Sequence, residues 1–250
     1  MFRLLAPLLS LLLPTELSAQ TELGRGVAEG ESSDPVRPDE LGFVGKIACG
    51  TDFGKIVSTA ILVNDRRTLL TVAHFNFDDL SGRVIPVEDC LFHWSDRSGN
   101  MRFTSKFKVF SLGGNHAVYS LTRAADWALV QLETQAPFTA QPIRVGGPAE
   151  SNGGIEVGFV GYTSRYQRVG SPIWQTDCHV APVEHKRMLV LHRCKTAPGS
   201  SGGALVAKVD GRYRLIAIHT GRTSESGIAV RIEGALARSI ALVARGEVGS

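Results

Sequence analysis

Several features are absent from this sequence, and each absence excludes a class of protein. After the N-terminal segment no apolar run approaches the roughly eighteen residues of a membrane-spanning helix. Lysine and arginine form no continuous run, the net charge is only +3, and aromatic residues make up 7% of the chain, so no nucleic-acid partner is expected. No glycine-rich phosphate-binding loop is present, and we expect no cofactor.

Cysteine is scarce, and its spacing does not indicate a metal or redox site. The sequence contains no Cys-x-x-Cys motif. No convergent acidic partners lie at ligand spacing from His93, His116, His179, His185 and His192, which we interpret as surface or strand residues, so no metal is expected. Four cysteines allow three disulfide connectivities. Because two cysteines lie in each half of the chain, the simplest pairing joins Cys49 to Cys90 and Cys178 to Cys194.

The N-terminus has the layout of a secretory signal. Arg3 precedes an apolar run over residues 4–13, and the small residues Ser18 and Ala19 suit cleavage by a signal peptidase. A buried N-terminal helix is the weaker alternative. We therefore predict a signal peptide over residues 1–19, and a secreted or periplasmic protein with no membrane association once it is removed. Disulfides form in such a compartment.

The rest of the chain has the pattern of a β protein. Residues 20–40 are rich in Gly, Glu, Ser, Asp and Pro, which predicts a flexible leader or pro-segment. From Leu41 onward, short apolar runs recur between turn signals, which predicts strands and an all-β barrel or sandwich. Examples are the runs at 44–49, 56–63, 68–73, 103–110, 127–132, 155–160, 188–191, 204–209, 215–218 and 228–232.

Only the C-terminus shows helical spacing. Apolar residues at 232, 236, 240 and 243 fall on one face, which predicts a C-terminal helix and tail over residues 232–250. The Pro- and Gln-containing segment 135–142 separates two roughly equal sets of strands. We interpret it as the crossing between a first β-barrel, residues 41–136, and a second, residues 137–231.

A candidate nucleophile lies in the glycine-rich segment 199–203. Ser201 stands between glycines, which let the backbone turn sharply and bring N–H groups toward a reacting carbonyl. A serine hydroxyl becomes reactive only when a base takes its proton and a third group orients that base. Alone, this segment could equally be a plain loop between strands.

A candidate base and a candidate orienting acid precede this serine. His74 ends an apolar strand, and Asp126 opens the apolar run 126–130, where a buried carboxylate would need a specific donor. Each residue taken alone could be structural. All three lie at the edges of predicted strands, in the order His74, Asp126, Ser201, on both sides of the predicted crossing. This arrangement predicts a serine hydrolase.

The blocks 71–74, 125–130 and 199–204 resemble the three signature blocks of the chymotrypsin-like serine peptidases. The resemblance extends from about Leu41 to the C-terminal helix. It implies an all-β fold of two antiparallel six-stranded barrels with the active site between them, a polypeptide substrate and a monomer. It also implies that His74 is the general base and then acid, that Asp126 orients it, and that the N–H groups of Gly199 and Ser201 form the oxyanion hole.

The sequence departs from the vertebrate digestive enzymes of that family at informative positions. Phe75 stands where those enzymes have a cysteine, so their disulfide beside the histidine is absent. Ser200 replaces the aspartate that pairs with their new N-terminus, which does not support the same activation switch. Lys195 lies where trypsin has its aspartate, so selection of basic side chains is not supported.

The segment 218–221 is more similar to the bacterial branch that includes the staphylococcal glutamyl endopeptidases. That resemblance implies that Thr196 and His219 contact an acidic substrate side chain, with Thr220 and Gly221 in the same binding strand. An imidazole and a hydroxyl can bind a carboxylate. The alternative, that His219 packs in the strand and bonds a backbone carbonyl, stays equally open.

Two other functions remain alternatives. The spacing Gly199-x-Ser201-x-Gly203 also fits an α/β-hydrolase esterase, but that fold has its acid and histidine after the serine, and only His219 follows Ser201 here. A catalytically inactive binding protein on the peptidase scaffold is the second alternative. The presence of all three triad residues argues against it.

Overall fold

The structure is a computed structural model that describes residues 42–51, 54–78, 81–96, 98–114, 123–146, 156–163, 172–182, 188–209 and 211–247. All of them belong to one compact unit, residues 33–250. The predicted signal peptide and the leader, residues 1–40, lie outside the described residues.

The described residues form fifteen strands, two short 3-10 helices and one α-helix. In chain order these are β1 (Val44–Thr51), β2 (Gly54–Leu62), β3 (Thr68–Thr71), β4 (Phe77–Asp78), β5 (Arg83–Val84), η1 (Val87–Asp89), β6 (Cys90–Ser95), β7 (Met101–Ser105), β8 (Phe107–Leu112), η2 (Arg123–Ala125), β9 (Ala128–Leu132), β10 (Glu156–Gly161), β11 (Ile173–Pro182), β12 (Leu189–His192), β13 (Ala204–Val209), β14 (Arg212–Arg222), β15 (Gly227–Arg231) and α1 (Gly234–Ala244). The all-β fold class with a C-terminal helix is confirmed.

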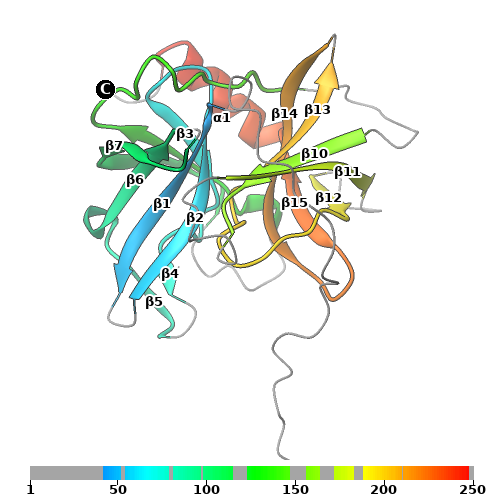
Figure 1. Ribbon diagram of the computed structural model, residues 1–250, viewed down its shortest axis with the longest axis horizontal. Helices are drawn as coiled ribbons and strands as arrows, with labels where there is room; N and C mark the ends of the chain where they lie inside the picture. The colour runs from blue at the N-terminus through cyan, green and yellow to red at the C-terminus, as the bar shows by residue number, and fades with distance from the viewer. Residues whose placement is uncertain are drawn as a thin grey trace, which may run out of the picture. The chain divides into compact units, whose positions relative to one another are not determined.

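The first half of the chain forms one antiparallel sheet in the order β7-β6-β1-β2-β3-β9-β8. It contains seven strands rather than the expected six, because β7 and β8, its two edge strands, are consecutive in the chain with only Lys106 between them. One bent stretch therefore pairs with β6 on one side and with β9 on the other. A small β4-β5 hairpin lies apart from this sheet (Figure 1).

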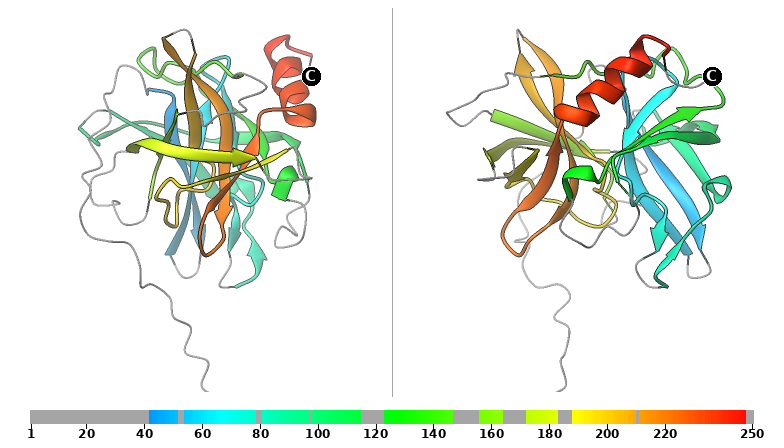
Figure 2. Two further views of the ribbon diagram at one scale, coloured as in Figure 1. Left: turned by 90° about the vertical axis from the view of Figure 1, so that its right-hand side faces the viewer. Right: turned by 180° about the vertical axis from the view of Figure 1, so that it is seen from behind.

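The second half of the chain forms a closed barrel in the order β10-β11-β12-β15-β14-β13, with every pair antiparallel. Its six strands agree with the expected number. Figure 2 shows the two strand systems beside one another, with α1 after the last barrel strand. Closure of the barrel leaves no unpaired edge, so every strand has two neighbours.

The C-terminal helix α1 buries the face that its apolar spacing predicts. Leu236 and Ile240, four residues apart, are both buried. The amide of Asn64, in the β2–β3 turn, donates a hydrogen bond of 3.0 Å to the carbonyl oxygen of Ile240. The helix is thereby anchored to the first sheet.

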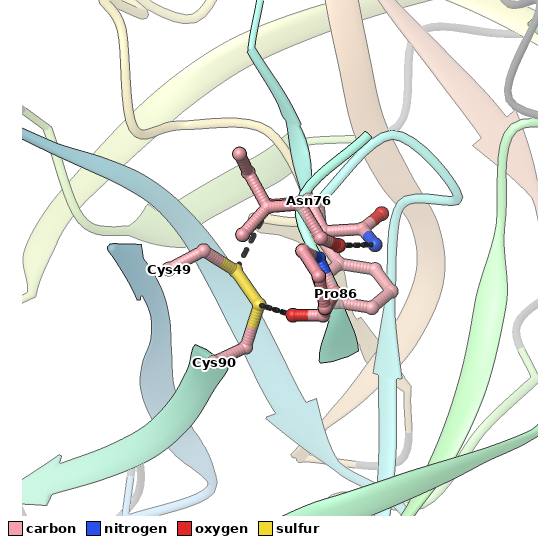
Figure 3. The surroundings of a disulfide bond; sticks show 6 residues. Cys49, Asn76, Pro86 and Cys90 are labelled. Carbon is pink, nitrogen blue, oxygen red and sulfur yellow. Dashed lines mark hydrogen bonds between the residues drawn. A yellow bond between two sulfur atoms is a disulfide. The ribbon is translucent and has the colours of Figure 1, made fainter. Parts of the chain in front are cut away.

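Both disulfides of the simplest pairing are present, and the described residues contain no free cysteine. The Cys49–Cys90 bridge joins β1 to β6 (Figure 3). The Cys49 sulfur lies 3.8 Å from the carbonyl oxygen of Phe75, the residue after His74. The Cys49–Cys90 bridge therefore contacts the segment after His74. In the vertebrate digestive enzymes that segment carries a disulfide of its own, at the position of Phe75.

The segment after His74 also makes hydrogen bonds to the residues that precede η1. Asn76 donates from its side chain to the carbonyl oxygen of Ile85 at 2.6 Å, and the Ile85 N–H donates to the Asn76 carbonyl oxygen at 2.7 Å (Figure 3).

Two disulfides fit a protein of an oxidising compartment. Within the described ranges, no helix is long and apolar enough to cross a membrane.

Candidate active site

The predicted base and orienting acid meet in the structure. The Nδ1 atom of His74, in the turn after β3, lies 2.8 Å from Oδ2 of Asp126, which follows η2. The other carboxylate oxygen of Asp126 accepts the backbone N–H groups of Ala73 at 3.0 Å and of His74 at 3.2 Å. The Asp126 side chain is 1% exposed, so these donors replace the water that a carboxylate would otherwise bind.

This arrangement determines the tautomer of His74. A carboxylate only accepts hydrogen bonds, so Nδ1 of His74 carries the hydrogen and donates it to Asp126. The lone pair of the neutral ring is then on Nε2. The His74 side chain remains 22% exposed, which leaves its other edge accessible to a reactant.

In the described structure, two backbone N–H groups of the segment 199–203 have no hydrogen-bond acceptor. Ser200 N–H donates to the Ala197 carbonyl oxygen at 3.0 Å, Gly202 N–H to that of His219 at 2.8 Å, and Gly203 N–H to that of Ser200 at 2.8 Å. Within the described part of the chain, the N–H groups of Gly199 and Ser201 have no acceptor. These are the two donors that the resemblance to chymotrypsin-like peptidases implies for an oxyanion hole.

Two local features give this turn its shape. Gly199 and Gly202 have φ values of +94° and +84°, a region that favours glycine. A Cβ atom on Gly202 would overlap the carbonyl oxygen of Thr59. The hydroxyl of Ser200, which is fully buried, accepts the Ala197 N–H at 3.1 Å and so caps the turn where vertebrate relatives have aspartate.

Thr59 of β2 connects the nucleophile turn to the first sheet. Its N–H donates to the carbonyl oxygen of Ser201 at 2.7 Å, and its hydroxyl donates to that of Gly199 at 2.9 Å. The same hydroxyl accepts the N–H of Tyr162, after β10, at 2.9 Å. The carbonyl oxygen of Thr59 accepts the hydroxyl of Thr71, three residues before His74, at 2.8 Å.

Sequence reasoning did not find Thr59, and no local signal could have found it. Its partner Gly199 is 140 residues away.

Among the described contacts, the Ser201 hydroxyl itself makes no hydrogen bond to His74. Catalytic hydrogen bonds often shorten only when substrate is bound, so this geometry is compatible with a triad.

The candidate specificity residue His219 lies in the interior of the second barrel. It is 4% exposed, and its Nδ1 atom lies 2.9 Å from Nε2 of His192 in β12, which is 1% exposed. The Phe159 ring packs against both imidazoles. The sequence predicts His192 to be a surface or strand residue; it lies in β12, but it is buried and forms the partner of His219.

Burial makes both imidazoles neutral over the ordinary pH range. Desolvation lowers the pKa of His192 to about 4. Desolvation also lowers the pKa of His219 well below its usual value, with further contributions from His192, His74, Arg123 and Arg222. The pair therefore shares one hydrogen between Nε2 of His192 and Nδ1 of His219.

The remaining predicted binding residues take up different positions. Thr196 lies between β12 and the nucleophile turn, and in the described structure no hydrogen bond joins it to His219. Thr220 is buried, with its hydroxyl 3.5 Å from the carbonyl oxygen of Ile228. Gly221 lies in β14 against the side chain of Arg123. The described residues contain no cluster of metal-ligating side chains.

The fold and site define a β protein with the architecture of a double-barrel peptidase. The trypsin-like peptidase domain model matches residues 58–218, more than half of the 250 residues, and the chain belongs to this family. No curated protein matches the sequence.

Among solved structures, 1132 chains match. One is a Glu endopeptidase in complex with MPD, with a TM-score of 0.62 and 14% sequence identity, covering 84% of this chain and 93% of that chain. At this identity the likeness establishes the fold, and the family model identifies the chain as a peptidase.

We predict that Thr59→Val lowers kcat by roughly tenfold to a hundredfold, because the part-buried Gly199 carbonyl and the buried Tyr162 N–H each lose a hydrogen-bond partner and the turn that carries Ser201 loses an anchor. Thr59→Ser, which keeps the hydroxyl, should retain most of the rate. The measurement is peptide hydrolysis normalised to active sites by titration, with Thr104→Val on exposed β7 as the control. Wild-type kcat per active site in the valine variant would contradict this role.

We also predict that the free energy of unfolding decreases as pH falls from about 6.5 to about 4. The folded pKa of His192 is below its unfolded value, so the unfolded chain binds more protons in this window. His192 alone contributes on the order of 3 kcal/mol. Urea unfolding across this range, in a Ser201→Ala background that removes the candidate nucleophile, measures the slope.

His192→Phe should flatten that slope, and His179→Gln, at an exposed position of β11, should leave it unchanged. An unaltered slope in His192→Phe would show that other groups govern the acid sensitivity.

Proposed function

We propose that this protein is an exported serine endopeptidase that hydrolyses peptide bonds through His74, Asp126 and Ser201. The observation that carries the proposal is the amide pattern of the nucleophile turn. The amides of Gly199 and Ser201 have no acceptor in the described structure, whereas those of Ser200, Gly202 and Gly203 do. Leaving two neighbouring donors free beside a serine is what stabilisation of a tetrahedral oxyanion requires.

The chemistry follows from the arrangement of hydrogens. Asp126 keeps the hydrogen of His74 on Nδ1, so Nε2 can take the proton of the Ser201 hydroxyl as its oxygen attacks the carbonyl carbon. The oxyanion then accepts the N–H groups of Gly199 and Ser201. The His74 imidazolium gives its proton to the leaving amine, and an acyl-enzyme on Ser201 remains. Water, activated by the same histidine, hydrolyses the ester.

We further propose that the substrate carries an acidic side chain before the cut bond. His219 uses Nδ1 for its bond to His192, and Nε2 makes no hydrogen bond among the described residues. If His192 donates to Nδ1, the hydrogen of neutral His219 lies on Nε2 and is available to a carboxylate. The Glu endopeptidase among the structural neighbours accords with this reading.

The two alternatives are less well supported. An α/β-hydrolase would need alternating helices and a parallel sheet, whereas the described strands pair in antiparallel ladders apart from two isolated bridges. An inactive binding protein has no need of a buried carboxylate that holds a histidine in one tautomer. Labelling with a fluorophosphonate probe distinguishes a peptidase from an inactive binding protein.

We predict that Ser201→Ala and His74→Ala each reduce kcat by at least about a thousandfold, and that the double variant is little worse than either single variant, because the residues act as a unit. A fluorophosphonate probe should label the wild-type protein and not Ser201→Ala. Arg238→Ala, on the exposed side of α1, serves as the control. Correctly oxidised wild-type protein that is not labelled would favour the binding protein.

We predict that a mixed peptide library is cut mainly after Glu or Asp, and that His219→Phe loses this preference while Ser201 is still labelled. The expected loss is roughly tenfold to a hundredfold in kcat/KM for acidic peptides, the usual worth of a hydrogen bond to a charged group. Cleavage chiefly after Lys, Arg or large apolar residues would refute the acidic preference.

A further inference from the structure

The short helix η2 that leads to Asp126 also carries an arginine beside the specificity strand. The carbonyl oxygen of Arg123 accepts the Asp126 N–H at 3.1 Å, which fixes the arginine backbone relative to the catalytic carboxylate. Its guanidinium lies against the backbone of Gly221, two residues after His219. A Cβ atom on Gly221 would overlap Nη1 of Arg123 and would lie 2.9 Å from its Cζ. With glycine at position 221 the guanidinium can lie directly on the β14 backbone, whereas a side chain there would require it to shift.

Among the residues that the structure describes, the positive charge of Arg123 has no negative partner. The residue is half-buried, and in the described part of the chain its guanidinium makes no ion pair or hydrogen bond. A partly desolvated cation without a partner is unfavourable, and an incoming anion would offset that cost. Arginine is also the side chain whose planar fork best matches a carboxylate.

The environment of His219 indicates why a second group is needed. Arg123 and Arg222 are both close enough to contribute to the lowered pKa of His219. A neutral imidazole can donate a hydrogen bond but cannot neutralise a carboxylate. A substrate carboxylate in this region must therefore find its compensating charge on a neighbouring cation.

The two arginines are not equivalent in this respect. Arg222 is exposed, and its Nε atom donates to the carbonyl oxygen of Thr223 at 3.4 Å. Charges that are open to water are strongly screened, whereas a half-buried charge keeps more of its effect. Arg123 is therefore the stronger candidate.

We infer that Arg123 is a specificity-determining residue whose guanidinium binds the carboxylate of an acidic side chain in the part of the substrate that precedes the cut bond. The inference rests on the proposed peptidase function and assigns the source of the charge that His219 does not supply. Gly221 contributes by having no side chain, since any larger residue would displace the guanidinium from the β14 backbone.

The experiment compares matched peptides that carry Glu or Gln at each position before the cut bond. For the wild type we expect a Glu/Gln ratio of kcat/KM well above one at one of these positions. Arg123→Met should lower that ratio roughly tenfold or more, and Arg123→Lys, which keeps the charge without the fork, should retain part of it. Arg238→Met removes an equal charge from exposed α1 and should leave the ratio unchanged.

A wild-type ratio that persists unaltered in Arg123→Met at every position would overturn the inference while leaving peptide hydrolysis intact. Absence of hydrolysis and of fluorophosphonate labelling in the wild type would overturn the proposed function instead. If Arg123→Met does not fold, Arg123→Lys decides instead. Its Glu/Gln ratio should lie below that of the wild type, because the lysine keeps the charge and loses the planar fork, and a ratio equal to that of the wild type at every position would count against Arg123.

Discussion

The hydrogen bonds of one buried threonine join the two strand systems where the chemistry would take place. Thr59 donates to the carbonyl oxygens of Gly199 and Ser201, accepts from Thr71 near the histidine, and accepts from Tyr162 at the end of β10. Because these carbonyls are held from the first sheet, the amides of the same turn are left to face a reactant. The position of Ser201, the candidate nucleophile, thus depends on a contact between the two halves of the chain that neither half could supply alone.

His74 and His219 lie in opposite electrostatic environments. His74 borders a buried carboxylate that can compensate a positive charge during proton transfer. His219 borders a second imidazole and the ring of Phe159, and burial keeps both imidazoles neutral. The first environment suits a residue that gains and loses protons, and the second suits a residue that only donates a hydrogen bond.

Sequence patterns predicted the elements whose apolar residues are continuous. The run 204–209 coincides with β13, and the apolar spacing from 232 to 243 identified α1. The strands β6 and β11 were not predicted, because polar residues such as His93 and Gln175 interrupt their apolar runs. The triad candidates stood out because each had a local motif. Thr59 and His192 had none, since their importance arises from partners 140 and 27 residues away.

The candidate catalytic and recognition residues come closest together in the chain at η2, where Arg123 precedes Asp126 by three residues. One turn of chain places Asp126 under the histidine and Arg123 against the strand that carries His219 and Gly221. A glycine at 221 removes the side chain that would otherwise fill this space, and the guanidinium occupies it. The backbone of residues 123–126 therefore positions both Asp126, which orients His74, and the charge of Arg123. A substitution at position 123 that changes specificity must preserve the hydrogen bond from the Asp126 N–H to the carbonyl oxygen of residue 123.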